Sequence, residues 1–263
     1  MKNRNAYAVI TGASSGIGAA FAKILALEGY SLILVARRAE KLKEVKSHVE
    51  GYMHPDAICI THPMDVTDKK SCDSLFELLC DQKIGIFINN AGFGDCCYFP
   101  EGDITKELNM IDVNIKAMHY LTKLAIRRFR AQKMGYLLNV ASAAGLMPCG
   151  PYMATYYATK AYVVSLTLAI AKELKDHNSR IYVGCLCPGP VDTEFDHVAN
   201  VEFSIPGISP YYCASFAAEQ MKKRRELIIP KFPMALVTLL SRLTPRSIVT
   251  YLIARQQLRK IYR

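Results

Sequence analysis

Short apolar runs alternate with longer stretches of helical periodicity along most of the chain. The apolar runs occupy residues 6–10, 31–35, 57–60, 84–88, 136–140 and 181–186. They contain no polar alternation, which is typical of parallel strands that are buried on both faces. The stretches between them are long enough for crossover helices, which we expect at 17–28, 39–50, 69–81, 106–132 and 154–177. The pattern therefore predicts an α/β fold, a doubly wound parallel sheet with helices on both faces.

The last part of the chain follows a different pattern. Two shorter helices are expected at 210–223 and 234–243, and a basic helix after Pro245. A chain of 263 residues, of which 51% are hydrophobic and 21% charged, suits one globular domain with a large core. We expect residues 1–230 to form this domain, and residues 231–263 to form a helical extension packed on it or on a neighbouring subunit.

A glycine-rich turn follows the first predicted strand and opens the first predicted helix. It reads Thr11-Gly-Ala-Ser-Ser-Gly-Ile-Gly18. Glycines let the backbone turn tightly and approach a pyrophosphate, while the amides and dipole of a helix N-terminus attract its charge. The order of strand, glycine turn and helix therefore predicts a dinucleotide site, although a glycine-rich turn alone would be weak support for one.

The residues after the second predicted strand bear on which dinucleotide binds. In dinucleotide-binding folds this position meets the adenosine ribose, and an acid there binds the free 2′-hydroxyl. Here the chain reads Ala36-Arg37-Arg38, and arginine offers a planar, charged donor fork that suits a 2′-phosphate. We therefore expect NADP rather than NAD; the alternative is that both arginines are ordinary surface residues of the following helix. Asp65, after the third strand, is placed either to reach the adenine amine or to form a loop turn.

A second group of polar residues predicts acid–base chemistry. Tyr156 and Lys160 stand four residues apart, on one face of a predicted helix. A phenol titrates at about pH 10, so it needs a nearby cation to exchange protons near neutrality, and Lys160 supplies one. Ser142 ends the fifth predicted strand, at the edge where ligands of open α/β sheets bind. Asn114 stands mid-helix between apolar residues, which is unfavourable unless it satisfies a buried polar group or belongs to a site.

Taken together, these motifs resemble the short-chain dehydrogenase/reductase family, and in particular its hydroxysteroid dehydrogenase-like members. They appear in order from Thr11 to Thr193, and they include the segment Pro188-Gly-Pro-Val-Asp-Thr193. The resemblance implies a Rossmann fold in which the protein aligns a nicotinamide cofactor for hydride exchange with a carbonyl or secondary alcohol.

The resemblance also implies roles for single residues. Tyr156 would be the general acid in reduction and the general base in oxidation, and Ser142 would support the substrate oxygen. Lys160 would lower the tyrosine pKa and hold the nicotinamide ribose, while Asn114 would anchor a water that links Lys160 to solvent. No metal is expected. The residues expected to bind the cofactor are Gly12, Ser14, Ser15, Gly16, Ile17, Gly18, Arg37, Arg38, Asp65, Val66, Asn90, Ala91, Gly92, Tyr156, Lys160, Pro188, Gly189, Val191 and Thr193.

Three loops, at 94–99, 146–153 and 192–210, are expected to determine the substrate. The side chains expected to form the pocket wall are Leu146, Met147, Tyr152, Met153, Phe195, Val198 and Phe203. Their apolar character favours a bulky lipophilic ketone, steroid-like in size, although such residues also serve simply to pack loops. The alternative within enzymes is reduction of a 3-oxoacyl thioester. An alternative of another class is an NADP-binding regulatory protein that has lost turnover.

The nine cysteines are scattered and form no CxxC pair, which favours reduced thiols in a cytoplasmic protein. The apolar run at 6–10 is too short for the core of a signal peptide. We therefore expect a cytoplasmic location. By resemblance, the helices at 106–132 and 154–177 are expected to join subunits into a homodimer or homotetramer.

The formal net charge of +10 belongs to the end of the chain. Residues 222–263 hold eleven Lys and Arg but only one acid, Glu226 (11 − 1 = +10), while the other residues balance at 22 − 22 = 0. Nucleic-acid binding is not expected, because charge is its only support. Between contact with a membrane surface and docking on protein we favour docking, because the apolar positions after Pro245 form no single helical stripe.

Overall fold

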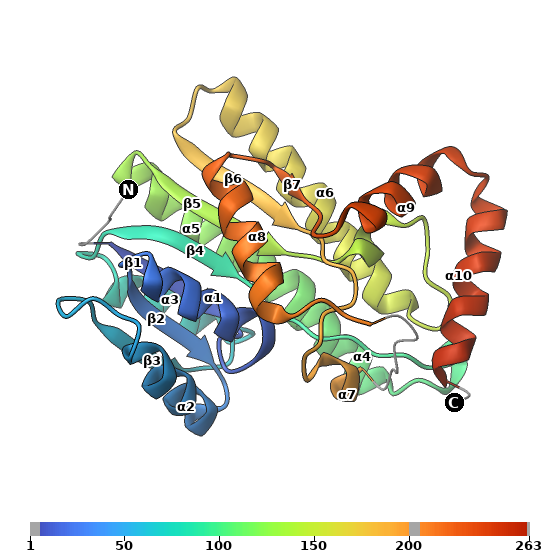
Figure 1. Ribbon diagram of the computed structural model, residues 1–263, viewed down its shortest axis with the longest axis horizontal. Helices are drawn as coiled ribbons and strands as arrows, with labels where there is room; N and C mark the ends of the chain where they lie inside the picture. The colour runs from blue at the N-terminus through green and yellow to red at the C-terminus, as the bar shows by residue number, and fades with distance from the viewer. Residues whose placement is uncertain (1–5, 200–205, 262–263) are drawn as a thin grey trace.

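The computed structural model describes residues 6–199 and 206–261. Within them, seven parallel strands form one sheet in the order β3-β2-β1-β4-β5-β6-β7 (Figure 1). The strands are β1 (Tyr7–Thr11), β2 (Ser31–Ala36), β3 (Cys59–Pro63), β4 (Ile84–Asn89), β5 (Gly135–Val140), β6 (Ile181–Leu186) and β7 (Leu227–Ile228). The predicted doubly wound parallel sheet is confirmed.

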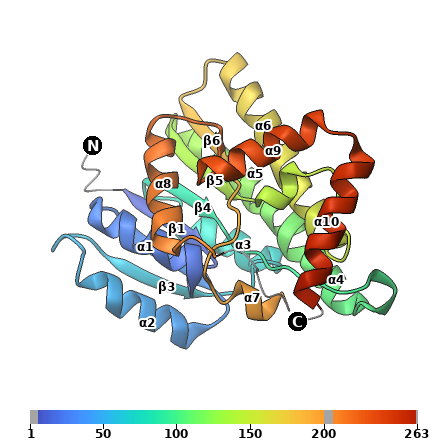
Figure 2. The same ribbon diagram turned by 45° about the vertical axis from the view of Figure 1, so that its right-hand side comes forward.

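Helices cover both faces of the sheet, as the apolar strands require. One face carries α1 (Gly16–Leu27), α2 (Ala39–Glu50) and α8 (Pro210–Lys222). The other carries α3 (Lys69–Leu78), α5 (Met118–Gln132) and α6 (Ala154–Asp176) (Figures 1 and 2). Side chains alternate between the two cores along each strand. In β1, for example, Ala8 and Ile10 face α1 and α8, while Val9 faces the opposite layer.

The chain order places a crevice between β1 and β4. From β1 the chain winds outward through β2 to β3, and it then returns to β4 on the other side of β1. The helices that follow β1 and β4 therefore leave toward opposite faces, and open α/β sheets bind ligands at such a switch point. The Thr11 hydroxyl joins the two strand ends by accepting hydrogen bonds from the backbone amides of Asn90 (2.9 Å) and Ala91 (3.0 Å).

Three elements differ most from the prediction. The strand expected at 57–60 is instead β3, at Cys59–Pro63. The single helix expected at 106–132 is instead α4 (Ile104–Ile111), a π-helical stretch (Asp112–Ala117) and α5. The wider π turn carries Asn114, and π-helical turns often occur at functional sites. The short strand β7 was not predicted, because two residues are too few to leave a periodic pattern.

The helices that end the chain are α9 (Phe232–Leu243) and α10 (Arg246–Ile261), and they stand at the end of the molecule farthest from β3 (Figure 1). Among the described residues, two polar contacts join α10 to the body. The amide of Gln257 donates to the Tyr157 hydroxyl (2.9 Å), and the Thr250 hydroxyl lies 3.0 Å from the Cys149 thiol. In the part of the chain that the structure describes, no helix is both long and apolar enough to cross a bilayer.

Candidate active site

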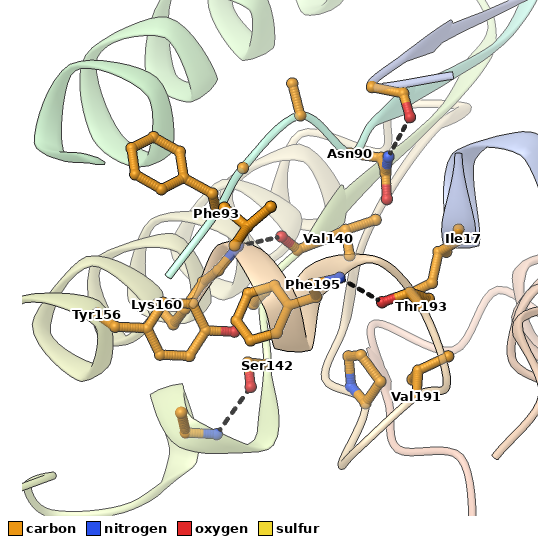
Figure 3. Close-up of a pocket in the computed structure, with 18 of the residues that line it drawn as sticks. Ile17, Asn90, Phe93, Val140, Ser142, Tyr156, Lys160, Val191, Thr193 and Phe195 are labelled. Atoms are coloured by element: carbon orange, nitrogen blue, oxygen red, sulfur yellow. Dashed lines mark hydrogen bonds between the residues drawn. The ribbon is translucent and has the colours of Figure 1, made fainter. Parts of the chain in front are cut away.

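A cleft of about 800 Å³ opens at the carboxyl ends of the strands, across the crevice between β1 and β4 (Figure 3). Every residue predicted to bind the cofactor lines it except Gly18, and three of the four predicted catalytic residues line it as well. Gly18 and Asn114 are the exceptions, and both lie directly behind the wall. Tyr156, Lys160 and Ser142 gather at one end of the cleft, away from Ile17 at the other (Figure 3).

The glycine-rich turn forms the floor of the outer end. Gly12 and Gly16 have φ angles of +63° and +55°, which side-chain-bearing residues rarely adopt. A Cβ atom on Gly18 would lie 2.3 Å from the carbonyl oxygen of Gly12, so a glycine is needed there for close packing of α1 on the turn. The first turn of α1 contains no acid that would compete with a bound phosphate for its amides.

Arg38 organises the outer rim of the cleft. Its guanidinium donates to the Ser14 hydroxyl (3.1 Å) and to the Ser15 hydroxyl (2.8 Å). The same guanidinium forms a salt bridge with Glu194 (2.8 Å), in which both side chains are 49% exposed. The hydrogen bond from Arg38 lowers the pKa of the Glu194 carboxyl. Sequence reasoning missed Glu194, because nothing in its local sequence pairs it with an arginine 156 residues earlier.

Arg37 and Asp65 face each other at the same rim, with 3.9 Å between the guanidinium and the carboxylate. The other carboxylate oxygen of Asp65 accepts from the amide (2.9 Å) and hydroxyl (2.8 Å) of Thr67. This contact is the loop turn that was one of the two readings of Asp65, and Asp65 also lines the cleft. Its contact with the adenine amine stays a prediction.

At the inner end, β5 and α6 bring three side chains together. Ser142 follows β5, accepts a hydrogen bond from the Ala144 amide (3.2 Å) and is hydrogen-bonded to the phenol of Tyr156. Lys160 donates to the backbone carbonyl of Val140 (3.1 Å), and its ammonium nitrogen lies 5.8 Å from the centre of the Tyr156 ring. Tyr156 and Lys160 are 8% and 4% exposed, so the group is nearly dry.

Burial is the main influence on proton affinity at this end. It raises the pKa of the Tyr156 phenol, and the hydrogen bond with Ser142 opposes that rise. Burial also lowers the pKa of Lys160 to about 8, because the ammonium loses its hydration. Lys160 is therefore still mostly charged at neutral pH, next to a phenol that is reluctant to ionise.

Asn114 is fully buried and uses its side chain on the protein itself. Its amide donates to the Phe93 carbonyl (2.8 Å) and to the Thr159 hydroxyl (3.1 Å), and its carbonyl accepts from the Phe93 amide (3.1 Å). A Cβ atom on Gly92 would lie 2.9 Å from the Asn114 carbonyl and 3.2 Å from the Lys160 nitrogen. Asn114 thus satisfies a buried polar segment, and the glycine leaves the space between Asn114 and Lys160 free of a side chain.

The wall beside Tyr156 is largely apolar. The Phe195 ring packs 5.5 Å from the Tyr156 ring, and Met147, Met153 and Val198 line the same cleft, as the loop analysis predicted. Sequence reasoning missed Phe93, Met234, Val237, Gln256 and Gln257, which also line it. The last four come from α9 and α10, whose position over the cleft no local pattern reveals.

Two of the predicted wall residues lie elsewhere. Leu146 packs in a separate cluster with Val163 and Val164 of α6, because the 3-10 turn Ala143–Leu146 directs it inward. Tyr152 lies 6.5 Å from Tyr98, centre to centre, outside the main cleft. Phe203 lies outside the described residues.

Comparison with known proteins identifies a family and several relatives of this chain. A family model described as short chain dehydrogenase matches residues 6–202. A protein of Pyrenophora tritici-repentis (strain Pt-1C-BFP) named very-long-chain 3-oxoacyl-CoA reductase is 31% identical over 218 residues. The match covers 81% of this chain but only 63% of the fungal protein.

Two solved structures share the fold and part of the sequence. The first is a short-chain dehydrogenase from Sphingobium yanoikuyae in complex with NADPH, 28% identical, with a TM-score of 0.79 over 86% of this chain and 88% of the other. The second is the bulky-bulky ketone specific alcohol dehydrogenase from Comamonas testosteroni, 26% identical, with a TM-score of 0.75 over 88% of both chains.

Proposed function

The chain belongs to the short-chain dehydrogenase family, and on that premise we propose that it is an NADP(H)-dependent oxidoreductase that interconverts a ketone and a secondary alcohol on a lipophilic, steroid-like substrate. One observation carries the proposal. Tyr156, Ser142 and Lys160 converge at the dry end of a cleft whose other end bears a glycine turn and a serine–arginine cluster. Proton transfer and phosphate binding therefore have separate places in one cavity.

The residues at the outer end fit NADP. The glycine turn leaves room for a pyrophosphate against the first turn of α1. Arg38, held by Ser14 and Ser15, offers charged donors of the kind that bind a 2′-phosphate. When bound, the cofactor supplies or accepts the hydride. The NADPH complex of the Sphingobium relative supports this choice.

At the inner end, the proposed work of this chain is to move a proton and to orient the substrate oxygen. In reduction, Tyr156 donates its phenolic proton to the carbonyl oxygen as the carbon gains a hydride, which yields the alcohol and a phenolate. The Lys160 ammonium stabilises that phenolate and holds the nicotinamide ribose. Ser142 donates a hydrogen bond to the substrate oxygen. In oxidation the same proton travels in the opposite direction.

Asn114 has a supporting part in this proposal. It holds the backbone of Phe93 and thereby keeps the segment after β4 at a fixed distance from Lys160. The space beside Gly92 is the place we assign to a water that would connect Lys160 with solvent.

The apolar wall supports a bulky lipophilic substrate. Phe195 and Met153 pack with Tyr156, Met234 lines the same cleft, and none of the three side chains carries a charge. The Comamonas relative, named for bulky-bulky ketones, supports the same class. A second candidate is a 3-oxoacyl thioester, which the name of the Pyrenophora relative favours. The homodimer or homotetramer, the cytoplasmic location and the division at residue 230 stay predictions.

The test is consumption of NADPH and NADH by purified protein with hydroxysteroid ketones, 3-oxoacyl thioesters and small aryl ketones. Tyr156→Phe should lower kcat by about 10²- to 10⁴-fold, the usual contribution of a general acid. Tyr162→Phe is the matched control, because Tyr162 lies on the same helix but is 37% exposed, is hydrogen-bonded to His119 and does not line the cleft. The preferred ketone identifies the substrate class.

Two results would contradict the proposal. Turnover that survives Tyr156→Phe would require a different proton donor. Tight NADPH binding without turnover on any ketone would favour the regulatory alternative, in which the fold is kept and the chemistry lost.

A further inference from the structure

The helices α9 and α10, together the C-terminal helix pair, expose an unusual amount of apolar surface. Eight large apolar side chains on the pair are between 44% and 78% exposed. They are Leu236, Val237, Leu239, Leu240, Leu243, Ile248, Tyr251 and Leu252. Scattered exposed leucines are ordinary, but contiguous apolar patches on a soluble surface mark interaction sites.

The opposite side of the pair is anchored to the protein. On α10, Val249, Ile253 and Gln257 recur every four residues and are at most 8% exposed. On α9, Thr238 is 3% exposed. The apolar positions after Pro245 are therefore divided between a buried side, with Val249 and Ile253, and an exposed side, with Ile248, Tyr251 and Leu252. This explains why the sequence shows no single stripe, which was the reason for favouring docking on protein. We call the exposed apolar side chains of the pair its outer stripe.

The charge of the C-terminal helix pair indicates which kind of partner binds its outer stripe. No Asp or Glu occurs after Glu226, whereas seven Lys and Arg lie between residues 231 and 263. Lys231, Arg246 and Arg255 are exposed. A second copy of the chain would bring two strongly basic faces together, which like-charge repulsion opposes. Anionic phospholipid headgroups would be attracted to the same face.

We propose that the C-terminal helix pair lies on an anionic membrane surface. Its outer stripe enters the boundary between headgroups and acyl chains, and its arginines and lysines contact lipid phosphates. The pair lies on the bilayer rather than spanning it, because no described helix can cross. Met234 and Val237 of α9 line the cleft, so the proposed membrane-binding pair also forms part of the cleft wall.

The proposal is tested by flotation of the full chain with lipid vesicles at low salt. We expect the protein to float with vesicles that contain phosphatidylserine and to float less with pure phosphatidylcholine or at high salt. Replacing Leu239 and Leu243 together by Ser should weaken binding by at least about tenfold, because two buried leucines are lost from the interface. Neither residue lines the cleft.

Two further variants separate the electrostatic contribution to vesicle binding from the apolar contribution. Arg246→Gln with Arg255→Gln should reduce binding to anionic vesicles and its salt dependence, even if the leucine variant folds poorly. Leu27→Ser with Leu78→Ser is the matched control, because these leucines are 54% and 62% exposed on other helices. It should float like the parent protein, and the thermal midpoint of each variant reports on folding.

Three results would overturn the proposal. The first is failure of the parent protein to float with anionic vesicles at low salt. The second is equal loss in the control and in the leucine variant. The third is a dimer, seen by light scattering, that dissociates on Leu239→Ser while flotation is unchanged, since a second copy would then be the partner. Every readout is binding or mass, so the result does not depend on turnover.

Discussion

The two ends of the cleft differ in water and in charge. At the outer end, Arg38 and Glu194 are half exposed and paired with each other. At the inner end, Tyr156 and Lys160 are nearly dry, and burial moves the pKa of both in the direction of the uncharged form. The same cavity thus combines an open, charged rim with a desolvated pocket.

The difference suits the two tasks that we propose. A rim that binds and releases a phosphate needs full charges, and solvent lowers the cost of separating them between turnovers. A proton-transfer site needs pKa values close to the working pH, and burial is the available means of moving that of a lysine. The Arg38–Glu194 pair and the buried Lys160 can therefore be perturbed separately.

After the loss expected for Tyr156→Phe, the largest expected effect concerns pH at the inner end. Because the pKa of Lys160 is lowered to about 8, the ammonium is lost as pH rises through that value. The rate of ketone reduction should then fall about tenfold per pH unit, or about a hundredfold by pH 10. The measurement is kcat against pH. Lys160 differs in this from two neighbouring groups whose pKa values are raised. Burial raises the pKa of the Tyr156 phenol, and a hydrogen bond with Cys185 together with burial raises the pKa of the Cys187 thiol.

Lys160→Arg supplies the control for this prediction. A guanidinium stays charged, so the falling limb should move upward even where the absolute rate is lower. A limb that stays near pH 8 in this variant would assign the titration to another group. The free energy of unfolding reports the same titration with the opposite sign. The unfolded chain binds more protons than the folded one between pH 8 and 10.5. The Lys160 contribution to the free energy of unfolding should therefore increase with pH across that window.

The next largest effect is expected at the outer end, on cofactor binding. Arg38→Ala should raise the KM for NADPH by about 10- to 100-fold, the worth of a charge-assisted hydrogen bond to phosphate. The KM for NADH should change little, because NADH has no 2′-phosphate. Steady-state kinetics with both cofactors make each the control for the other. Equal loss with both would mean that Arg38 only supports the turn through Ser14 and Ser15.

The smallest expected effect concerns Glu194 and the affinity for NADPH. Glu194 competes with a phosphate for the Arg38 guanidinium. Glu194→Gln should tighten NADPH binding by about two- to fivefold, the scale of an exposed ion pair, and high salt should reduce the gain. Fluorescence titration of NADPH is the measurement. Weaker binding in the variant would show that Glu194 orients Arg38 rather than competing for it.

Much of the fold and of the candidate site could be predicted because the signals are local. Apolar runs of four to six residues predicted six of the seven strands, and the helix at 39–50 agrees with α2 residue for residue. Tyr156 and Lys160 are one helical turn apart, so their shared direction follows from the helix itself. Arg38 and Ser142 follow strands, and parallel strands end at one edge of the sheet.

Other features depend on residues that are far apart in the chain. The pairing of Arg38 with Glu194, the two-sided burial of α10 and its place over the cleft are decided only when the chain is packed. The same holds for the pKa of Lys160, because desolvation depends on what surrounds a group and not on its neighbours in sequence. The sequence by itself determined most of the elements, their order and the residue types that they carry. Tertiary structure decided which of those groups meet and how much water they keep, since contact and burial are properties of the packed chain.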